Sequence, residues 1–212
     1  MKVCIYVCLA AILCAQSLAG AQTIEMTDYG FSVFNDTGWA SDNRLNFTVA
    51  ISDEGQGKVG FVFKNASSIS SSITAVYFDD SSLLNSVKDI FNGSGVSFSA
   101  GARPRSLPAG NELDPAFAKK PFFAADSDPP TSKNGINPGE WLKITFNLNA
   151  GKNFSSVIEQ ITAGSSKIGI HIQSLPKDDS VSAINNTTPV PEPATVAILS
   201  FGSFLVIWKR RK

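Results

Sequence analysis

Cysteine and histidine are almost missing from this chain, and their scarcity limits the chemistry that it can perform. The three cysteines, Cys4, Cys8 and Cys14, lie close to the N-terminus, and His171 is the single histidine. The rest of the chain can therefore form no disulfide, no cysteine nucleophile and no cysteine-ligated zinc site. A G-x-S-x-G turn, which carries the serine nucleophile of many hydrolases, is also absent.

Clusters of positive charge are missing from the middle of the chain. The 212 residues include 18 basic and 18 acidic side chains, but five basic residues lie at the two ends. Residues 22–193 contain 13 basic and 18 acidic residues, a net charge of about −5. Because binding to nucleic acid needs clustered Lys and Arg, we do not expect a nucleic acid partner.

The first 21 residues have the layout of a secretory signal peptide. Lys2 precedes an apolar run, and small residues follow with Ala19 and Ala21 in an A-x-A cleavage pattern. The run is shorter than the roughly 20 residues that span a bilayer, which disfavours the alternative of an uncleaved anchor. We therefore expect residues 1–21 to direct export and to be removed.

Between the two ends, apolar and polar residues alternate with the period of half-buried β-strands. Residues 45–51 and 59–63 alternate on either side of a turn and predict a hairpin, and residues 73–78 predict an inner strand. Further runs occur at 95–98, 142–148 and 168–172, with weaker ones at 23–26 and 31–34. The pattern predicts a mainly β domain over residues 22–184, an antiparallel β-sandwich of about seven to nine strands.

Three segments depart from this alternation. Residues 153–163 have helical apolar spacing, with Asn153 as a plausible N-cap, and predict one short helix. Residues 83–91 also fit helical spacing, but the span is short and runs into a turn, so both assignments stay open. Residues 101–139 are rich in proline without a period and predict a long loop that packs down on the sheet.

Candidate sites for chemistry are few. His171 would lie on the strand face opposite Ile170 and Ile172, so we interpret it as a polar strand residue rather than a general base. Calcium takes carboxylate oxygens from loops, and four aspartates are weak candidates for such a site: Asp79, Asp80, Asp126 and Asp128. None lies in a calcium-loop pattern, so no cofactor is expected apart from this weak calcium candidate. A lectin-like module would instead expose aromatic rings, and the residues to inspect are Trp39, Tyr29 and Trp141.

The C-terminal segment, residues 190–212, combines three features. It begins with a short motif: Pro191, Glu192 and Pro193. Residues 194–208 are apolar or small and would reach about 22 Å as a helix, against a hydrocarbon core of about 30 Å. Four basic residues end the chain and would hold that end in the cytoplasm: Lys209, Arg210, Arg211 and Lys212. The polar residues 185–189 are expected to form a linker before the motif.

This segment, PVPEPATVAILSFGSFLVIWKRRK, resembles the PEP-CTERM sorting signal of Gram-negative bacteria, which has the same motif, membrane stretch and basic end. The resemblance implies recognition by an exosortase, a membrane-embedded enzyme with a cysteine-dependent, sortase-like role. It further implies a precursor anchored in the inner membrane, removal of the tail, and delivery to the cell surface or the exopolysaccharide matrix. The stretches ITAVYFDD and NGINPGEWLKITF also resemble a domain of such exported proteins, which has no activity to transfer.

We therefore expect an exported, non-enzymatic surface or matrix protein whose β domain is structural or associated with glycans. The expected partners are the exosortase, the inner membrane during processing, and exopolysaccharide. Three alternatives stay open. The chain could be a carbohydrate-active enzyme of the envelope that uses paired carboxylates, a calcium-dependent lectin-like module, or a simple type I membrane-anchored protein.

Overall fold

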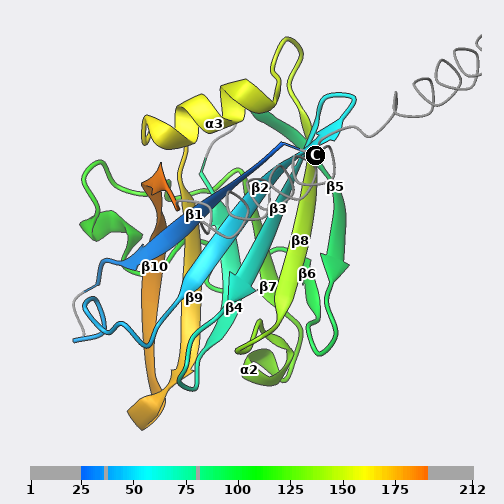
Figure 1. Ribbon diagram of the computed structural model, residues 1–212. Coiled ribbons are helices and arrows are strands. Elements are labelled where there is room, and N and C mark those ends of the chain that lie inside the picture. The colour runs from blue at the N-terminus through cyan, green and yellow to red at the C-terminus, as the bar shows by residue number, and fades with distance from the viewer. Residues whose placement is uncertain (1–24, 36–37, 80–81, 191–212) are drawn as a thin grey trace, which may run out of the picture.

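A computed structural model describes residues 25–35, 38–79 and 82–190. Its ten strands form one antiparallel sheet in the order β5-β8-β3-β2-β1-β10-β9-β4-β7-β6 (Figure 1). The strands are β1 (Met26–Val33), β2 (Phe47–Gly55), β3 (Lys58–Asn65), β4 (Ser72–Phe78), β5 (Leu84–Asn92), β6 (Phe98–Ala100), β7 (Phe123–Ser127), β8 (Trp141–Leu148), β9 (Ile168–Leu175) and β10 (Asp179–Pro189). Within the described residues they are accompanied by two short α-helices, α2 (Thr131–Asn134) and α3 (Phe154–Thr162), and by two single turns of 3₁₀ helix, Gly110–Glu112 and Pro176–Asp178.

The sheet curves back on itself around one core. The ring of Phe78 on β4 lies 5.0 Å from that of Phe61 on β3 and 4.8 Å from that of Phe146 on β8. Four strands separate β3 from β4 in the sheet, so these contacts require its two halves to face each other. The prediction of a mainly β, antiparallel domain is confirmed. The expected sandwich of two sheets with seven to nine strands is instead a single continuous sheet, because β1 and β10 pair and join the halves.

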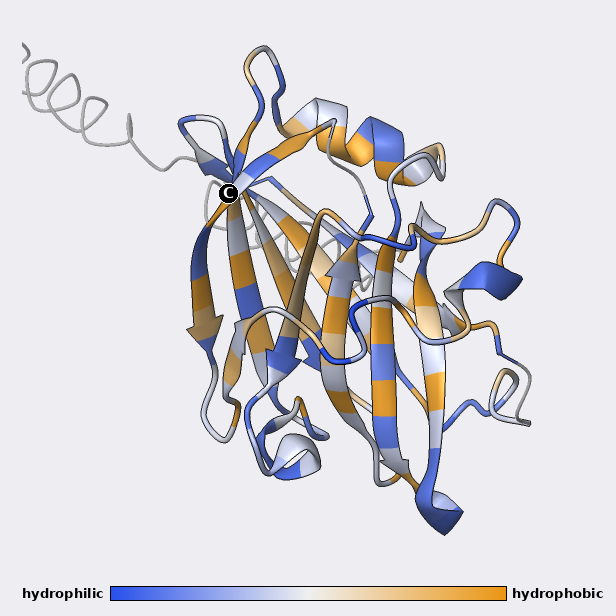
Figure 2. Ribbon diagram, turned by 180° about the vertical axis from the view of Figure 1, so that it is seen from behind, coloured by the Kyte–Doolittle hydropathy of each residue, from blue (hydrophilic) through white to orange (hydrophobic). Residues whose placement is uncertain are grey.

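Alternation along the strands places the core on the inner face of the sheet. Val49 and Ile51 of β2 and Phe61 and Phe63 of β3 are buried, whereas their neighbours along each strand point outwards. Figure 2 shows this alternation of hydrophobic and hydrophilic residues along the strands. Burial of one such side chain stabilises the fold by about 1.5–3 kcal/mol. The hairpin predicted from residues 45–63 is confirmed.

Strand β4 is buried on both faces, because the long loop packs against its outer side. Ala75 and Tyr77 form a second apolar cluster with Leu107 and Phe117 of the loop. The Tyr77 hydroxyl donates to the Pro104 carbonyl at 3.0 Å. The predicted packing of the loop on the sheet is thus observed. The segment is more regular than expected, because it also contains β7 and α2.

Helix α3 is the helix predicted near residues 153–163. The Asn153 side chain accepts a hydrogen bond from Ser156 N at 3.0 Å and caps the first turn. Phe154, Val157 and Ile161 are buried in the main core, so the helix covers one end of the curved sheet, opposite α2 (Figure 1).

Two segments differ from the sequence-based expectation. Residues 83–91, left open between helix and strand, lie almost entirely in the edge strand β5, whose register shifts twice along β8. The prediction of a linker at residues 185–189 is wrong, because these residues form the end of β10. Asn185 is buried there and accepts a hydrogen bond from Ile168 N at 2.7 Å. The sheet therefore extends to Pro189 and not only to residue 184.

The targeting segments lie outside the described residues. These are the signal peptide expected at 1–21, the motif at 191–193, the apolar stretch at 194–208 and the basic end at 209–212. Of the helices within residues 25–190 that the structure describes, none has the length and apolar character needed to cross a bilayer.

Candidate functional site

A groove opens at the end of β7, where residues 99–105 face residues 126–131. It has a volume of about 690 Å³, and Gln173 of β9 also lines it. Charged side chains of both signs surround the space: Arg103, Arg105, Asp126 and Asp128. The groove therefore brings together two of the aspartates that the sequence singled out.

Asp126 reaches this groove from the outer face of β7. It pairs with Ala75 of β4, which pairs in turn with His171 of β9, so Asp126 and His171 flank a residue with a single methyl group. Asp126 Oδ2 accepts a hydrogen bond from Arg103 N at 3.2 Å. Burial raises the pKa of Asp126 above its ordinary value of 3.8, although the bond from Arg103 opposes the shift.

His171 lies half-buried on the face of β9 opposite Ile170 and Ile172. Its Nδ1 atom is 3.5 Å from Ser182 Oγ, and its Nε2 atom is 3.4 Å from Gln173 Nε2. Burial lowers the pKa of His171 below its ordinary value of 6.5, so the ring is neutral at pH 7. A neutral ring between two polar neighbours is consistent with a polar strand residue.

Asp128 holds the region of β6 against the end of β7. Its Oδ2 accepts a hydrogen bond from Ser97 Oγ at 2.7 Å, and its Oδ1 accepts one from Ser99 Oγ at 2.9 Å. These bonds lower the pKa of Asp128 below 3.8 because they favour the charged form. Both carboxylate oxygens are engaged within the protein, so Asp128 has a structural task at the rim of the groove.

The four calcium candidates do not come together in one place. Asp79 follows the end of β4 and its Oδ1 accepts a hydrogen bond from Lys167 N at 2.7 Å, whereas Asp126 pairs with Ala75 in the middle of that strand. Asp80 lies outside the described residues. Within residues 25–35, 38–79 and 82–190, no group of three or more His, Asp or Glu side chains is placed to hold a metal ion.

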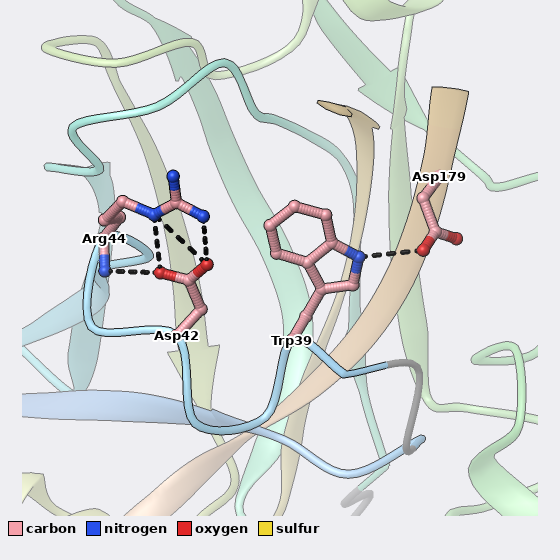
Figure 3. A network of polar contacts seen from close by, with 4 residues as sticks. All are labelled: Trp39, Asp42, Arg44 and Asp179. Carbon is pink, nitrogen blue, oxygen red and sulfur yellow. Dashed lines mark hydrogen bonds and ion pairs between the residues drawn. The ribbon is translucent and has the colours of Figure 1, made fainter. Parts of the chain in front are cut away.

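Two of the three aromatic candidates are tied into the fold. Tyr29 is fully buried, and its Oη lies 3.0 Å from Thr162 Oγ1, which connects β1 to α3. Trp39 packs against the main core, and its Nε1 donates to Asp179 Oδ2 at 2.8 Å (Figure 3). Both rings therefore serve packing.

The loop that carries Trp39 is shaped by a local ion pair (Figure 3). Arg44 Nη2 lies 2.6 Å from Asp42 Oδ2, and Arg44 N donates to Asp42 Oδ1 at 2.9 Å. The hydrogen bonds from Arg44 lower the pKa of Asp42 to about 2. Because the pair is exposed to solvent, it orders the loop locally and contributes little to global stability.

Trp141 is the aromatic candidate with an exposed ring. It stacks on Phe91 of β5 with ring centroids 5.7 Å apart and an angle of 12° between the planes. Phe91 escaped the sequence analysis because residues 83–91 also fitted a helix. The signal that identifies it is the register of β5 on β8, in which Phe91 pairs with Lys143, two residues from Trp141.

The residues predicted for sorting and cleavage lie outside the described residues. They are Ala19 and Ala21 at the signal cleavage site, the motif residues Pro191, Glu192 and Pro193, and the basic residues Lys209, Arg210, Arg211 and Lys212. The last described residue before this motif is Val190, whose N–H donates to the Asp28 carbonyl at 2.7 Å.

Comparison with known proteins assigns no family. The chain matches no family model, no curated protein and no solved structure. The function must therefore be argued from the sequence and from the geometry of this sheet.

Proposed function

We propose that the chain is an exported protein of the cell surface or extracellular matrix, sorted by an exosortase through residues 190–212. Its β domain is non-enzymatic and has a structural or glycan-associated role. The observation that carries the proposal is the coincidence of a signal peptide pattern with three ordered features at the other end, namely the Pro-Glu-Pro motif, the apolar stretch and the basic end. Each feature alone would be common, but together and in this order they resemble the sorting signal.

The described domain supports this role in two respects. The described residues contain no cysteine, and the sheet is held together by a large apolar core instead of a disulfide. Asp128 and His171, two titratable residues on the outer side of the sheet, face hydrogen-bonding neighbours of their own protein. Both features are consistent with a binding or structural module.

The proposal is tested by expressing the full chain in two strains, with and without an active exosortase. We expect loss of the residues that follow the motif only in the strain with the enzyme, as measured by intact mass of the product. Glu192→Ala should keep the tail in both strains, whereas the matched change Glu112→Ala, on the exposed loop, should be processed normally. An unchanged tail and membrane retention in both strains would contradict sorting and leave a simple type I anchor.

A second candidate function is hydrolysis of a glycosidic bond in the groove at the end of β7. It is favoured by one observation, namely that Asp126 and Asp128 line the same groove, where burial raises the pKa of Asp126 and the hydrogen bonds from Ser97 and Ser99 keep Asp128 charged. Carboxylates with separated pKa values are typical of an acid and its partner in such enzymes. Release of reducing sugar from polysaccharide by the wild type, abolished by Asp126→Asn, would support it. The absence of any turnover would remove it.

A further inference from the structure

A second hollow lies on the outer face of the sheet, over strands that are not neighbours of β4 in the strand order. It has a volume of about 600 Å³ and spreads over β3, β8 and β5. Its lining combines two aromatic rings with three lysines, two carboxylates and one hydroxyl: Glu54, Lys58, Lys88, Asp89, Phe91, Trp141, Lys143 and Thr145. We name this surface the aromatic–lysine face.

The two aromatic rings of this face form an apolar strip in contact with solvent. Phe91 is 57% exposed and Trp141 is 36% exposed, among the few large hydrophobic residues with such exposure in the described part of the chain. Their planes are nearly parallel and the rings are stacked, so the solvent meets the edges of the pair and the outer part of the more exposed Phe91 ring. A pyranose ring can pack its C–H face on such a strip while its hydroxyl groups stay hydrated.

Polar side chains of the neighbouring strands lie beside the two aromatic rings. Thr145 can donate and accept a hydrogen bond, and the Asp89 carboxylate, its cross-strand partner, can accept one from a sugar hydroxyl. Lys143 Nζ lies 2.8 Å from Glu54 Oε1, and this ion pair crosses above β3. The crossing is possible because Gly60 has no side chain, since a Cβ there would lie 2.6 Å from the same Glu54 oxygen.

The charge of the face contrasts with that of the domain. Glu54 is paired with Lys143, which leaves Lys58 and Lys88 against Asp89. Lys64, the cross-strand partner of Trp141, adds another positive charge beside the ring. The face, with three lysines and two carboxylates, thus carries a net charge of about +1, whereas residues 22–193 together carry about −5. A local field of this sign attracts polyanions to this site and repels them elsewhere.

We infer that the aromatic–lysine face binds an acidic polysaccharide, a polymer of pyranose rings that carry carboxylates. The aromatic rings can pack against the sugar rings. The few separated lysines match a polymer with one negative charge per sugar better than they match double-stranded DNA, which carries about one charge per 1.7 Å. The open hollow also allows a chain to pass across it. This inference rests on the proposed placement of the domain outside the cell, where such polymers occur.

The inference is tested with the full-length chain in detergent and three polymers: alginate, neutral dextran and single-stranded DNA. We expect binding to alginate that weakens with salt, and little binding to dextran. Trp141→Ala and Phe91→Ala should each weaken alginate binding about tenfold. The double variant Lys58→Glu/Lys88→Glu should abolish it.

The matched control is the double variant Lys119→Glu/Lys120→Glu, which changes two exposed lysines of the long loop and should bind as the wild type does. Circular dichroism and thermal melting verify that each variant is folded. Equal binding to dextran and alginate, tighter binding to DNA, or unchanged binding by folded Trp141→Ala would overturn the inference. Tail removal by the exosortase is measured on the same variants and should be normal, so failure of the glycan site is distinguishable from failure of sorting.

Discussion

Strands β4 and β5 are consecutive in the chain, yet they have opposite environments. All seven residues of β4 are buried, with the main core on one side and the long loop on the other. In β5 only Leu84 is buried, and most of the other residues are exposed at the edge of the sheet. The comparison teaches that the loop, and not the sheet itself, decides which outer surface contributes to stability and which is open to a ligand.

The largest expected effect is at Phe78, which faces the core from the covered strand. Its ring contacts those of Phe61, Phe63, Phe123 and Phe146. Phe78→Ala should lower the free energy of unfolding by about 3–5 kcal/mol, because the cavity lies where both halves of the sheet meet. Urea denaturation measures it, and a loss below about 1 kcal/mol would show that the halves do not pack as described.

The comparison itself is tested by a pair of changes on the outer surface. Leu107 is buried against Gly169, so Leu107→Ala should cost about 2–3 kcal/mol by detaching the loop from β4 and β9. Phe91→Ala, on the open strand, should change stability by less than about 1 kcal/mol. Equal losses for the two variants would mean that the open and covered faces are not energetically distinct.

A smaller effect concerns pH on the covered side. Because burial lowers the pKa of His171, the unfolded chain binds a proton below its ordinary value of 6.5 while the folded chain stays neutral. Stability should therefore fall as the pH drops from about 7 to about 5. His171→Asn should flatten this dependence, as measured by melting temperature at the two pH values.

The raised pKa of Asp126 predicts the opposite dependence of stability on pH. Its raised pKa means that the folded state keeps a proton above 3.8, so its contribution to stability is lost as the pH rises above that value. Asp126→Asn should thus reduce the loss of stability that occurs as the pH rises above about 4. The loss of stability that His171 causes between pH 7 and pH 5 should remain in this variant. An identical pH profile for both variants would indicate that neither group is buried as described.

The smallest expected effect is at the ion pair that crosses β3. Lys143→Gln removes the ion-pair partner of Glu54. Partial burial alone would raise the pKa of Glu54, but the hydrogen bonds from Lys143 and Ser52 lower it. The pair is partly exposed, so the loss of stability should stay below about 1 kcal/mol. The same change should weaken alginate binding. A large loss of stability would instead show that Lys143 is needed for folding rather than for binding.

Much of the fold could be predicted because its signals are local. The hairpin at 45–63 follows from alternation within single strands, and α3 follows from its apolar spacing and the Asn153 cap. The strand β5 could not be assigned, because register shifts at residues 84–86 and 87–89 disturb the alternation that identifies a strand. The end of β10 was mistaken for a linker, since its Ser, Asn and Thr residues are polar although Asn185 is buried.

The candidate sites were harder to predict than the fold. Asp126 and His171 come from strands that are far apart in the sequence. They come close because both are cross-strand partners of Ala75 on β4. Phe91 and Trp141 likewise stack because β5 pairs with β8, which no spacing within either strand could indicate. Such constellations depend on non-local register, whereas a sorting motif is contiguous and can be recognised from a single stretch of sequence.

The hydrogen bond from Val190 N to the Asp28 carbonyl ties the last described residue to the neighbouring strand β1. Because both partners are backbone atoms, substitution of either side chain leaves the bond intact, and only Val190→Pro removes its donor.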